Sequence, residues 1–330
     1  MACMAHTGAG TRYYGYQATD TFIKVSEDGV ITVITPTPEI GQGTTTAIAQ
    51  IVAEKLGADL QDIRIVNDDT ELTTYDLGAI GSRETFICGN SALSAAEETK
   101  RELLEVAGRM LDAEPQTLRA VGGRVFPKDE PKGPSVTIRE VAEYAVFKMG
   151  RPISGRGRYA DELAPSASLS TGHTIHVPTW TFACQVAEVE VDQETGHVDV
   201  LKMTAIHDTG SVINPLLVEG QVEGSLAQGL GNALIEELVT EQGVPQNPSF
   251  TDYKIFHAED MPEMDIGFVD VFDSLGPFGA KGIGESGIVA TLAAVGNAIY
   301  HATGLELNQL PLSPERILRA VESAKVEPLT

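Results

Sequence analysis

The loop from Gly279 to Gly287 carries the clearest catalytic signal in this sequence. It holds four glycines and a single acid, Glu285. Glycine permits positive φ and close backbone approach, so a large ligand could lie against this loop. A carboxylate in such a place is a candidate general base, because burial and a helix dipole can both shift its pKa. The alternative is a carboxylate that only complements the dipole of the helix it precedes.

The segment after Glu285 predicts the helix that would position this acid. Apolar side chains recur at helical spacing from Ile288 to Tyr300. No Asp, Glu, Lys or Arg occurs between Ser286 and Gly304. We therefore expect a helix that is buried on most sides.

A second glycine loop, Glu39 to Gly43, lies between a predicted hairpin over residues 21–36 and a predicted helix over residues 44–56. We expect the hydroxyls of Thr44 to Thr46 to cap this helix and Gly57 to end it. The free N–H groups at a strand–loop–helix junction can bind an anionic or polar ligand. For the Gly-x-Gly sequence alone, a tight turn is the simpler explanation.

The rest of the chain predicts an alternation of strands and helices. Strands are expected at residues 63–66, 118–126, 187–191, 198–200 and 266–271 and near Ile255, and helices at residues 92–111, 138–149, 217–237 and 314–324. The glycines in the helix over residues 217–237 lower its stability, which indicates close approach of another backbone or a cofactor. Gln228, an amide that can both donate and accept, lies among them. His207 has no second ligand at metal-binding spacing, and we interpret it as a hydrogen-bonded structural histidine.

These elements predict an α+β fold of two mixed α/β lobes. We expect a tail at residues 1–18, a first lobe at residues 19–150, a crossover rich in Gly, Pro and Ser at residues 151–178, and a second lobe at residues 179–330 with the catalytic glutamate loop. The tail could be disordered or could lie on a partner. If it is ordered, its Tyr13 could stack on or hydrogen-bond a substrate ring.

Composition narrows the classes of partner and compartment. The formal net charge of −24 argues against nucleic-acid or anionic-membrane partners, which bind surfaces rich in Lys and Arg. The three cysteines are too scattered for a disulfide framework, a zinc site or an iron–sulfur cluster. No signal peptide is visible and the thiols are expected to be reduced, so we predict a cytoplasmic protein. Asn297 and His301 within the uncharged run favour a buried helix over a membrane span.

Four segments in this order form a recognisable set. They are Glu39-Ile40-Gly41-Gln42-Gly43, Gly81-Ser82-Arg83-Glu84-Thr85 through Gly89-Asn90, Gln221 to Gly231, and Lys281-Gly282-Ile283-Gly284-Glu285. Together they resemble the molybdopterin-binding subunit of the xanthine dehydrogenase/aldehyde oxidase family of molybdenum hydroxylases, over about residues 20–325. The chain is similar only to the C-terminal half of that subunit. A half-length subunit with its own first methionine implies a separate partner chain that supplies the N-terminal half.

The resemblance implies a molybdopterin cofactor, expected as the cytosine dinucleotide, whose dithiolene rather than the protein holds the molybdenum. By this resemblance the cofactor would be bound by Gly41, Gln42 and Gly43 near its metal end, by Thr85, Phe86, Cys88 and Asn90 at the pterin or its phosphates, and by Lys281 and Gly284. Gln228 would contact a ligand on the metal, which a terminal sulfido or selenido group would complete. Glu285 would be the base. The glycine-rich backbone donors suit an anionic phosphate and pterin amides.

The reaction implied by the resemblance is hydroxylation of an electron-poor carbon of an N-heterocyclic aromatic compound, with the oxygen coming from water. Nicotinate, converted to 6-hydroxynicotinate, is the expected substrate. A purine, an aldehyde or carbon monoxide is the alternative within the same family, and a non-catalytic structural subunit is the alternative outside catalysis. Electrons would leave through partner subunits that carry a 2Fe-2S cluster and FAD, because this chain has neither the cysteines nor a dinucleotide fingerprint for them.

Overall fold

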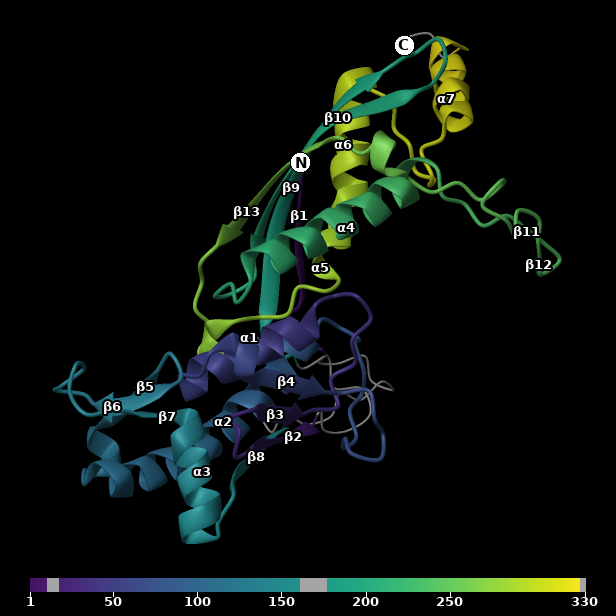
Figure 1. The fold of residues 1–330 in the computed structure, drawn as a ribbon. Helices are drawn as coiled ribbons and strands as arrows, with labels where there is room; N and C mark the ends of the chain where they lie inside the picture. Colours follow the sequence, from purple (N-terminus) through teal and green to yellow (C-terminus); the bar gives the residue numbers. More distant parts are fainter. Residues whose placement is uncertain (11–17, 161–176, 327–330) are drawn as a thin grey trace.

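The computed structural model describes residues 1–10, 18–160 and 177–326. Figure 1 shows them as two lobes stacked end to end, with β9 reaching from the upper lobe toward the lower one. Both lobes mix helices and sheets, as predicted. Tyr13 lies outside the described residues.

The first lobe is built on a sheet with the strand order β4-β3-β2-β8. These strands are β2 (Ala18–Val25), β3 (Ile31–Ile34), β4 (Ile63–Val66) and β8 (Ile153–Ala160). The predicted hairpin is confirmed, since β2 and β3 pair antiparallel. The crossover predicted at residues 151–178 was wrong at its start, because residues 153–160 pair with β2 as an edge strand of this lobe. This segment is rich in Gly and Arg and has no strand pattern of its own, so its pairing with a distant strand could not be predicted from the local sequence.

Helices cover this sheet and enclose the first core. They are α1 (Thr44–Leu56), α2 (Glu84–Leu111) and α3 (Ile138–Met149), joined by a small sheet of β5 (Leu118–Val121), β6 (Arg124–Pro127) and β7 (Val136–Thr137). α2 crosses the sheet very closely, because a Cβ at Gly157 would lie 2.1 Å from the carbonyl oxygen of Ser91. Glycine at this strand position is therefore required for the close approach of helix and sheet. Ile23, Ile48 and Leu103 are among the buried core residues.

α2 begins at Glu84, whereas the sequence predicted a helix from residue 92. The segment that reads as a glycine-containing loop is therefore the first part of a helix. Position 89 of this helix needs glycine, because a Cβ there would lie only 2.8 Å from Pro277 of the other lobe. Close packing outweighs the low helix propensity of glycine at this position.

The second lobe is built on a sheet with the order β1-β9-β10-β13. These strands are β1 (Ala2–Thr7), β9 (Trp180–Val191), β10 (Val198–Asp208) and β13 (Glu263–Val269), and the lobe also contains α4 (Pro215–Leu234), α5 (Ser286–Val289), α6 (Thr291–Thr303), α7 (Pro314–Val326) and the short pair β11 (Thr240–Glu241) and β12 (Val244–Pro245). The predicted β9–β10 hairpin is confirmed. Short 3-10 turns occur at Leu60–Asp62, Pro115–Thr117, Ala258–Asp260 and Pro277–Gly279.

Three predictions for this lobe were wrong. Residues 2–7 are not part of a tail without structure, because they pair antiparallel with β9. The helix predicted from Ser286 to Gly304 is interrupted at Ala290, and it is exposed along one side, where Val289 is 43% and Tyr300 is 52% accessible. No strand forms near Ile255, which lies in a loop.

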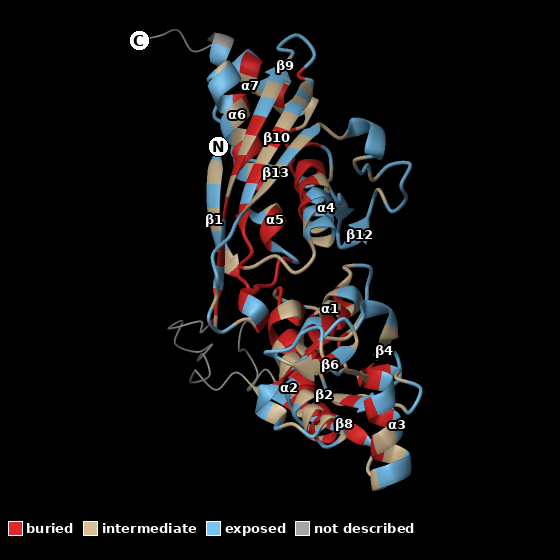
Figure 2. Ribbon diagram, turned by 60° about the vertical axis from the view of Figure 1, so that its left-hand side comes forward, coloured by how far each residue is buried: buried red, intermediate tan, exposed pale blue. Residues whose placement is uncertain are grey.

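One face of the second sheet packs on α4 and α6 and the other is open within the described part of the chain. Met203 and Ala205 face the helices in the buried core. The alternate residues point the other way and include Trp180 (45% exposed), Phe182 (54%), Ile206 (40%) and Val269 (46%). Cys3 and Cys184 lie opposite one another at the centre of this face. We call Cys3, Ala5, Trp180, Phe182, Cys184, Ile206 and Val269 the open sheet face; Figure 2 shows the burial of the strands that form it.

None of the helices in the described ranges is both long and apolar enough to cross a membrane.

Candidate functional site

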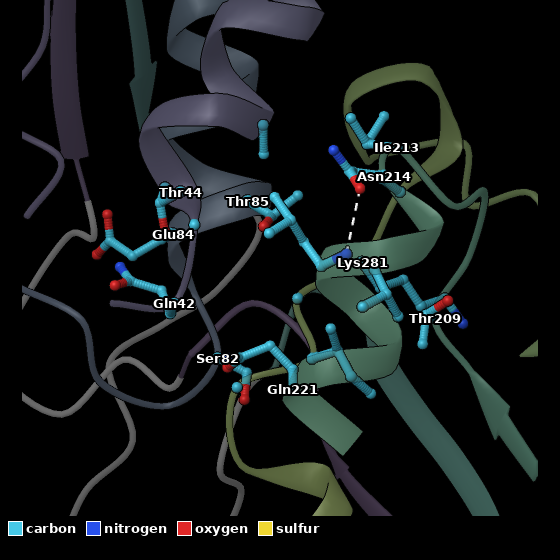
Figure 3. Close-up of a pocket in the computed structure, with 18 of the residues that line it drawn as sticks. Gln42, Thr44, Ser82, Glu84, Thr85, Thr209, Ile213, Asn214, Gln221 and Lys281 are labelled. Carbon is cyan, nitrogen blue, oxygen red and sulfur yellow. Dashed lines mark hydrogen bonds between the residues drawn. The ribbon is translucent and has the colours of Figure 1, made fainter. Parts of the chain in front are cut away.

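A cavity of about 220 Å³ lies where the two lobes meet. The first lobe lines it with the loop before α1, the start of α1 and the start of α2, and the second lobe with the segments after β10 and before α5. Figure 3 shows polar side chains from both lobes around it, among them Gln42, Thr85, Thr209, Gln221 and Lys281. Both glycine loops singled out in the sequence therefore reach one cavity.

Glu285 lies at this cavity directly before α5 and is held by the first lobe. Its carboxylate accepts a hydrogen bond from the backbone N–H of Gly81 (3.2 Å) and one from the hydroxyl of Ser82 (3.3 Å). Its own backbone N–H donates to the Ser82 oxygen at 3.0 Å. These hydrogen bonds fix the carboxylate. Because half of the side chain is accessible, it can still exchange a proton with a ligand or solvent.

The close backbone approach predicted for the Glu285 loop is an approach to another part of the protein. A Cβ at Gly282 would lie 1.7 Å from the carbonyl oxygen of Ser82. The backbone N–H of Gly282 also donates to the carbonyl oxygen of Gly8 at 2.7 Å. Glycine at this position thus allows three segments that are far apart in the sequence to meet beside Glu285.

The loop before α1 is stabilised by its own side chains. The Glu39 carboxylate accepts hydrogen bonds from the backbone N–H groups of Gly41, Gly43 and Thr45 and from the Thr45 hydroxyl. Burial alone would raise the pKa of Glu39, but these hydrogen bonds from Thr45, Gly43 and Gly41 lower it below its usual value. The prediction that threonine hydroxyls cap α1 was wrong, because no side chain caps it at Gly43 and Glu39 satisfies the free amides.

Gln42 lines the cavity with its amide already bonded within this loop. Its Nε2 donates to the carbonyl oxygen of Pro38 (2.8 Å) and its Oε1 accepts from the backbone N–H of Ile40 (2.7 Å). Gly43 forms the adjacent wall, with φ at 85°. A Cβ there would lie 2.8 Å from Leu217 of the second lobe, whereas a Cβ at Gly41 would meet nothing within 4 Å. Gly43, and not Gly41, therefore keeps the cavity open.

Lys281 and Thr209 line the cavity from the second lobe. The Lys281 ammonium donates to the Asp208 carboxylate (2.7 Å) and to the carbonyl oxygen of Trp180 (2.9 Å), so its charge is neutralised inside the protein. Thr209 is 2% exposed, and its hydroxyl has no hydrogen-bond partner among the described residues. A buried hydroxyl without a partner is costly, so a ligand with a polar group would satisfy it.

Two buried ionisable residues at the start of α2, Arg83 and Glu84, also line the cavity. The Arg83 guanidinium bonds Asp76 through Nη2 (3.0 Å) and Glu84 through Nη1 (2.9 Å). Burial, followed by the charge of Asp76, raises the pKa of Glu84 to about 7. The potential ligand atoms of Asp76, Glu84 and Cys88 lie within 4.8 Å of one another, as at a metal site. The arginine supplies the positive charge there instead, so the arrangement is an ion-pair network.

Thr85 lines the cavity, but two of its predicted companions do not. Phe86 is fully buried, with its ring edge-on to Tyr159 at 6.0 Å between centroids. Cys88 is also fully buried and donates to the Glu84 carboxylate at 3.2 Å. Burial raises the pKa of its thiol well above the ordinary value. Both side chains point into the lobe because residues 84–89 are helical.

Two further predicted residues lie outside the cavity lining. Asn90 donates to the carbonyl oxygen of Leu275 at 2.8 Å and thereby ties α2 to the second lobe. Gln228 is exposed on α4. Gln221, two turns earlier on the same helix, lines the cavity in its place.

The structure thus brings together Gln42, Gly43, Thr85, Lys281, Gly284 and Glu285, and leaves Gly41, Phe86, Cys88, Asn90 and Gln228 outside the lining. The sequence analysis missed Ser82, Thr209 and Gln221, although Ser82 and Gln221 stand inside segments that it quoted. It also missed Asn214, whose Oδ1 accepts from the backbone N–H of Leu217 at 3.1 Å and caps α4. The Asn-Pro pair at residues 214–215 was the available signal for that cap.

His207 is a fully buried residue of β10. Its Nε2 lies 3.5 Å from the side-chain nitrogen of Gln185, and burial lowers its pKa to about 4. The ring is therefore neutral at physiological pH. Among the described residues, no other candidate ligand gathers around it. Its Nδ1 has no hydrogen-bond partner among the described residues, so the structural role inferred for it stays a prediction.

Comparison with known proteins identifies the family of this chain. Residues 1–262 match the family model of the molybdopterin cofactor-binding domain. The xanthine dehydrogenase molybdenum-binding subunit of Escherichia coli O157:H7 is 32% identical over 320 residues, which are 96% of this chain and 41% of that protein. The 6-hydroxypseudooxynicotine dehydrogenase complex subunit gamma of Paenarthrobacter nicotinovorans is 35% identical, over 89% of this chain and 36% of that protein.

A solved structure has the same fold. Quinoline 2-oxidoreductase from Pseudomonas putida 86 superposes with a TM-score of 0.84 at 28% identity, covering 97% of this chain and 42% of that one. This chain therefore spans about two fifths of the length of these similar proteins.

Proposed function

This chain belongs to the molybdopterin cofactor-binding family of the molybdenum hydroxylases, and we propose that it forms part of the molybdenum-cofactor subunit of an enzyme that hydroxylates an N-heterocyclic aromatic compound. The observation that carries the proposal is the Glu285 carboxylate, fixed by Gly81 and Ser82 and half-accessible at a cavity between two lobes. A positioned carboxylate of this kind can act as a general base.

The residues at the cavity fit a large cofactor with polar groups. Gly43 leaves space that any side chain would fill, and the buried hydroxyl of Thr209 is without a partner in the described structure. Ser82, Thr85 and Gln221 add further polar side chains. For Gln42, contact with the cofactor requires that its amide give up Pro38 or Ile40, because both ends bond within the loop.

When bound, the cofactor would supply molybdenum and the redox chemistry that adds oxygen from water to carbon. In this proposal Glu285 accepts the proton released in that reaction, Ser82 orients its carboxylate, and Gln42, Gly43, Thr85, Lys281 and Gly284 hold the cofactor. The roles of Gly41, Phe86, Cys88, Asn90 and Gln228 are proposed from family resemblance alone, and the substrate contact of Tyr13 is proposed from its aromatic side chain. The cytosine dinucleotide form and a terminal sulfido or selenido ligand are likewise proposed.

Nicotinate is the substrate that we propose first, as in a nicotinate dehydrogenase. Support for an N-heterocycle comes from the names of similar proteins, which act on xanthine, 6-hydroxypseudooxynicotine, nicotine and quinoline. An aldehyde is the second candidate, because an aldehyde oxidoreductase molybdenum-binding subunit of Escherichia coli is 27% identical over 94% of this chain.

We also propose that a separate chain supplies the rest of the subunit, and that subunits with 2Fe-2S and FAD receive the electrons. The cavity of about 220 Å³ is smaller than the ~300–1,000 Å³ of most ligand pockets, so further walls are needed to enclose the cofactor. The open sheet face gives such a chain an apolar surface on which to pack. A cytoplasmic location is proposed from the three free cysteines.

Alkylation of Cys3 tests this partner. Cys3 is exposed on the open sheet face, whereas Cys88 is buried and serves as an internal control. We expect rapid modification of Cys3 in the isolated chain and strong protection in the native complex, read by mass spectrometry. Equal modification of Cys3 in both would mean that the partner does not cover this face.

Purification of the complex through a tag on this chain tests the function. We expect molybdenum, release of CMP on mild acid hydrolysis, and hydroxylation of nicotinate in a panel with xanthine, nicotine, quinoline and an aldehyde. If another compound of the panel is hydroxylated and nicotinate is not, that compound replaces nicotinate as the proposed substrate, and the proposed type of reaction stands. A folded complex without molybdenum would favour a structural subunit instead.

A further inference from the structure

We propose that His6 is the proton partner of Glu285: it takes up the proton that Glu285 accepts and passes it to solvent. The inference rests on the proposed role of Glu285 as the base. His6 lies on β1, a strand absent from the sequence prediction, with its Nε2 3.8 Å from the nearer carboxylate oxygen of Glu285. In the same strand the Nδ1 of His6 lies 2.8 Å from the carbonyl oxygen of Thr7.

The contact with Thr7 fixes the tautomer of the ring. A carbonyl oxygen can only accept, so Nδ1 must carry a hydrogen and donate it. In neutral His6, Nε2 is then an unprotonated acceptor that faces the carboxylate of Glu285. Two acceptors face one another at 3.8 Å, and a proton on either Nε2 or the carboxylate turns the contact into a donor–acceptor pair. The pair is therefore arranged to share a proton.

Glu285 is the ionic partner of His6 among the charged side chains near β1. Of the elements packed against β1, the part of β9 that pairs with it carries Cys184 as its only ionisable side chain. α5 has none, and α6 contributes His301 at its far end. The nearby Lys281 is bound to Asp208 at 2.7 Å. Among the described residues, Glu285 is thus the charged group within ion-pair distance of His6.

The proton path is short and balanced. The O–H bond of protonated Glu285 breaks, an N–H bond forms at Nε2 of His6, and the imidazolium then releases a proton to water. No electron is transferred in these steps. A small side-chain rotation or one bridging water closes the 3.8 Å gap. Glu285 lines the cavity that the cofactor would fill, whereas His6 does not and a quarter of its side chain is accessible, which gives the proton an exit when the cavity is occupied. His6 acts through Glu285 and is a positioning residue rather than a catalytic one.

The first test is the 15N NMR spectrum of the His6 ring in the full chain at one fixed pH, assigned with the His6→Gln variant. We expect Nδ1 to carry the hydrogen and Nε2 to face Glu285, so Glu285→Gln should move the Nε2 resonance because an amide donor can then replace a carboxylate acceptor. The ring nitrogens of His197, which lies 3.2 Å from Asp199, are an internal control and should keep their resonances. An unchanged Nε2 resonance of His6 would overturn the pairing, whether or not the complex is active.

The second test is rescue of turnover in the molybdenum-loaded complex. We expect His6→Ala to lower kcat by roughly 10-fold and added imidazole to restore most of it, while His197→Ala has no effect. A merely structural role would give a loss that imidazole does not repair. Full activity of His6→Ala would refute the inference while leaving the proposed function intact. An inactive wild-type complex that contains molybdenum would instead count against the proposed function.

Discussion

Ser82 and Glu285 stand 203 residues apart and exchange two hydrogen bonds across the junction of the lobes. The Ser82 oxygen accepts from the backbone N–H of Glu285 at 3.0 Å, and its hydroxyl donates to the carboxylate at 3.3 Å. Ser82 itself has a positive φ of 57°, a conformation that a serine adopts at some cost. One side chain of the first lobe thus fixes both the backbone and the carboxylate of the proposed base.

We predict that Ser82→Ala lowers kcat by roughly 10-fold, with molybdenum content unchanged. Losing a hydrogen bond to a charged group costs about 1.5–3 kcal/mol, of which only the part specific to the transition state appears in kcat. Steady-state kinetics of the complex checks this. Ser249→Ala is the control, because the hydroxyl of that exposed serine bonds Asp252 within the same loop and lies outside the cavity lining. A Ser82→Ala enzyme as fast as wild type would show that the contact does not orient Glu285.

We predict that Gly43→Ala empties the cofactor site while Gly41→Ala does not. Both glycines have positive φ, so each substitution strains the backbone by about 1 kcal/mol. Only the methyl group at residue 43 would collide with Leu217. Molybdenum analysis should therefore separate the two variants, and the melting temperature should fall further for Gly43→Ala because the collision adds to the backbone strain.

The double variant Gly43→Ala/Leu217→Ala should recover part of the molybdenum, because it removes the colliding side chain. Equal molybdenum loss in Gly41→Ala and Gly43→Ala would instead assign a role to Gly41 that the cavity lining does not suggest.

We predict that Thr209→Val weakens cofactor retention without destabilising the cofactor-free chain. Its hydroxyl has no partner in the described structure, so replacing it should raise the free energy of unfolding by about 1 kcal/mol or leave it unchanged. Thr19→Val is a matched control, since the Thr19 hydroxyl is likewise buried and without a described partner but does not line the cavity. Denaturation and molybdenum retention during dialysis measure the two effects. Identical retention in both variants would remove Thr209 from the site.

We predict that the free energy of unfolding decreases less with rising pH in Glu84→Gln than in wild type. Burial raises the pKa of Glu84 to about 7 from an ordinary 4.5, so the folded chain binds more protons than the unfolded chain between these values. The stability that this group contributes is present below pH 4.5 and is lost as pH rises through about 7. Urea denaturation at pH 5 and pH 8 should show a smaller difference for Glu84→Gln than for wild type. An equal difference would mean that Glu84 is already ionised at pH 5.

Local signals in the sequence predicted the elements that carry them. The helix over residues 138–149 was predicted at its observed bounds from its apolar period, and the structure adds a capping box of Thr137 and Glu140 at its start and Gly150 at its end. α1 was predicted from its apolar helical face and its end from Gly57, whereas its start is not capped by threonine as expected. The placement of Glu285 directly before a helix also followed from the change from a glycine loop to an apolar period.

Features that depend on distant partners could not be predicted in this way. β1 forms because it pairs with β9, far along the chain, and its residues have little strand pattern of their own. The early start of α2 depends on Gly89 packing against Pro277. The choice of Gln221 over Gln228 depends on which turn of α4 meets the other lobe. His6 was not predicted as a site residue because the strand that carries it, β1, forms only by pairing with β9.

The measurement that tests the account most directly is a comparison of wild type and Glu285→Gln in the purified complex. Molybdenum content and turnover of the best heterocyclic substrate would be measured on the same preparations. We expect equal molybdenum and a loss of turnover of at least about 10²-fold, because a positioned general base is removed while the cavity is preserved. Turnover close to wild type at equal molybdenum content would contradict the central claim that Glu285 is the base.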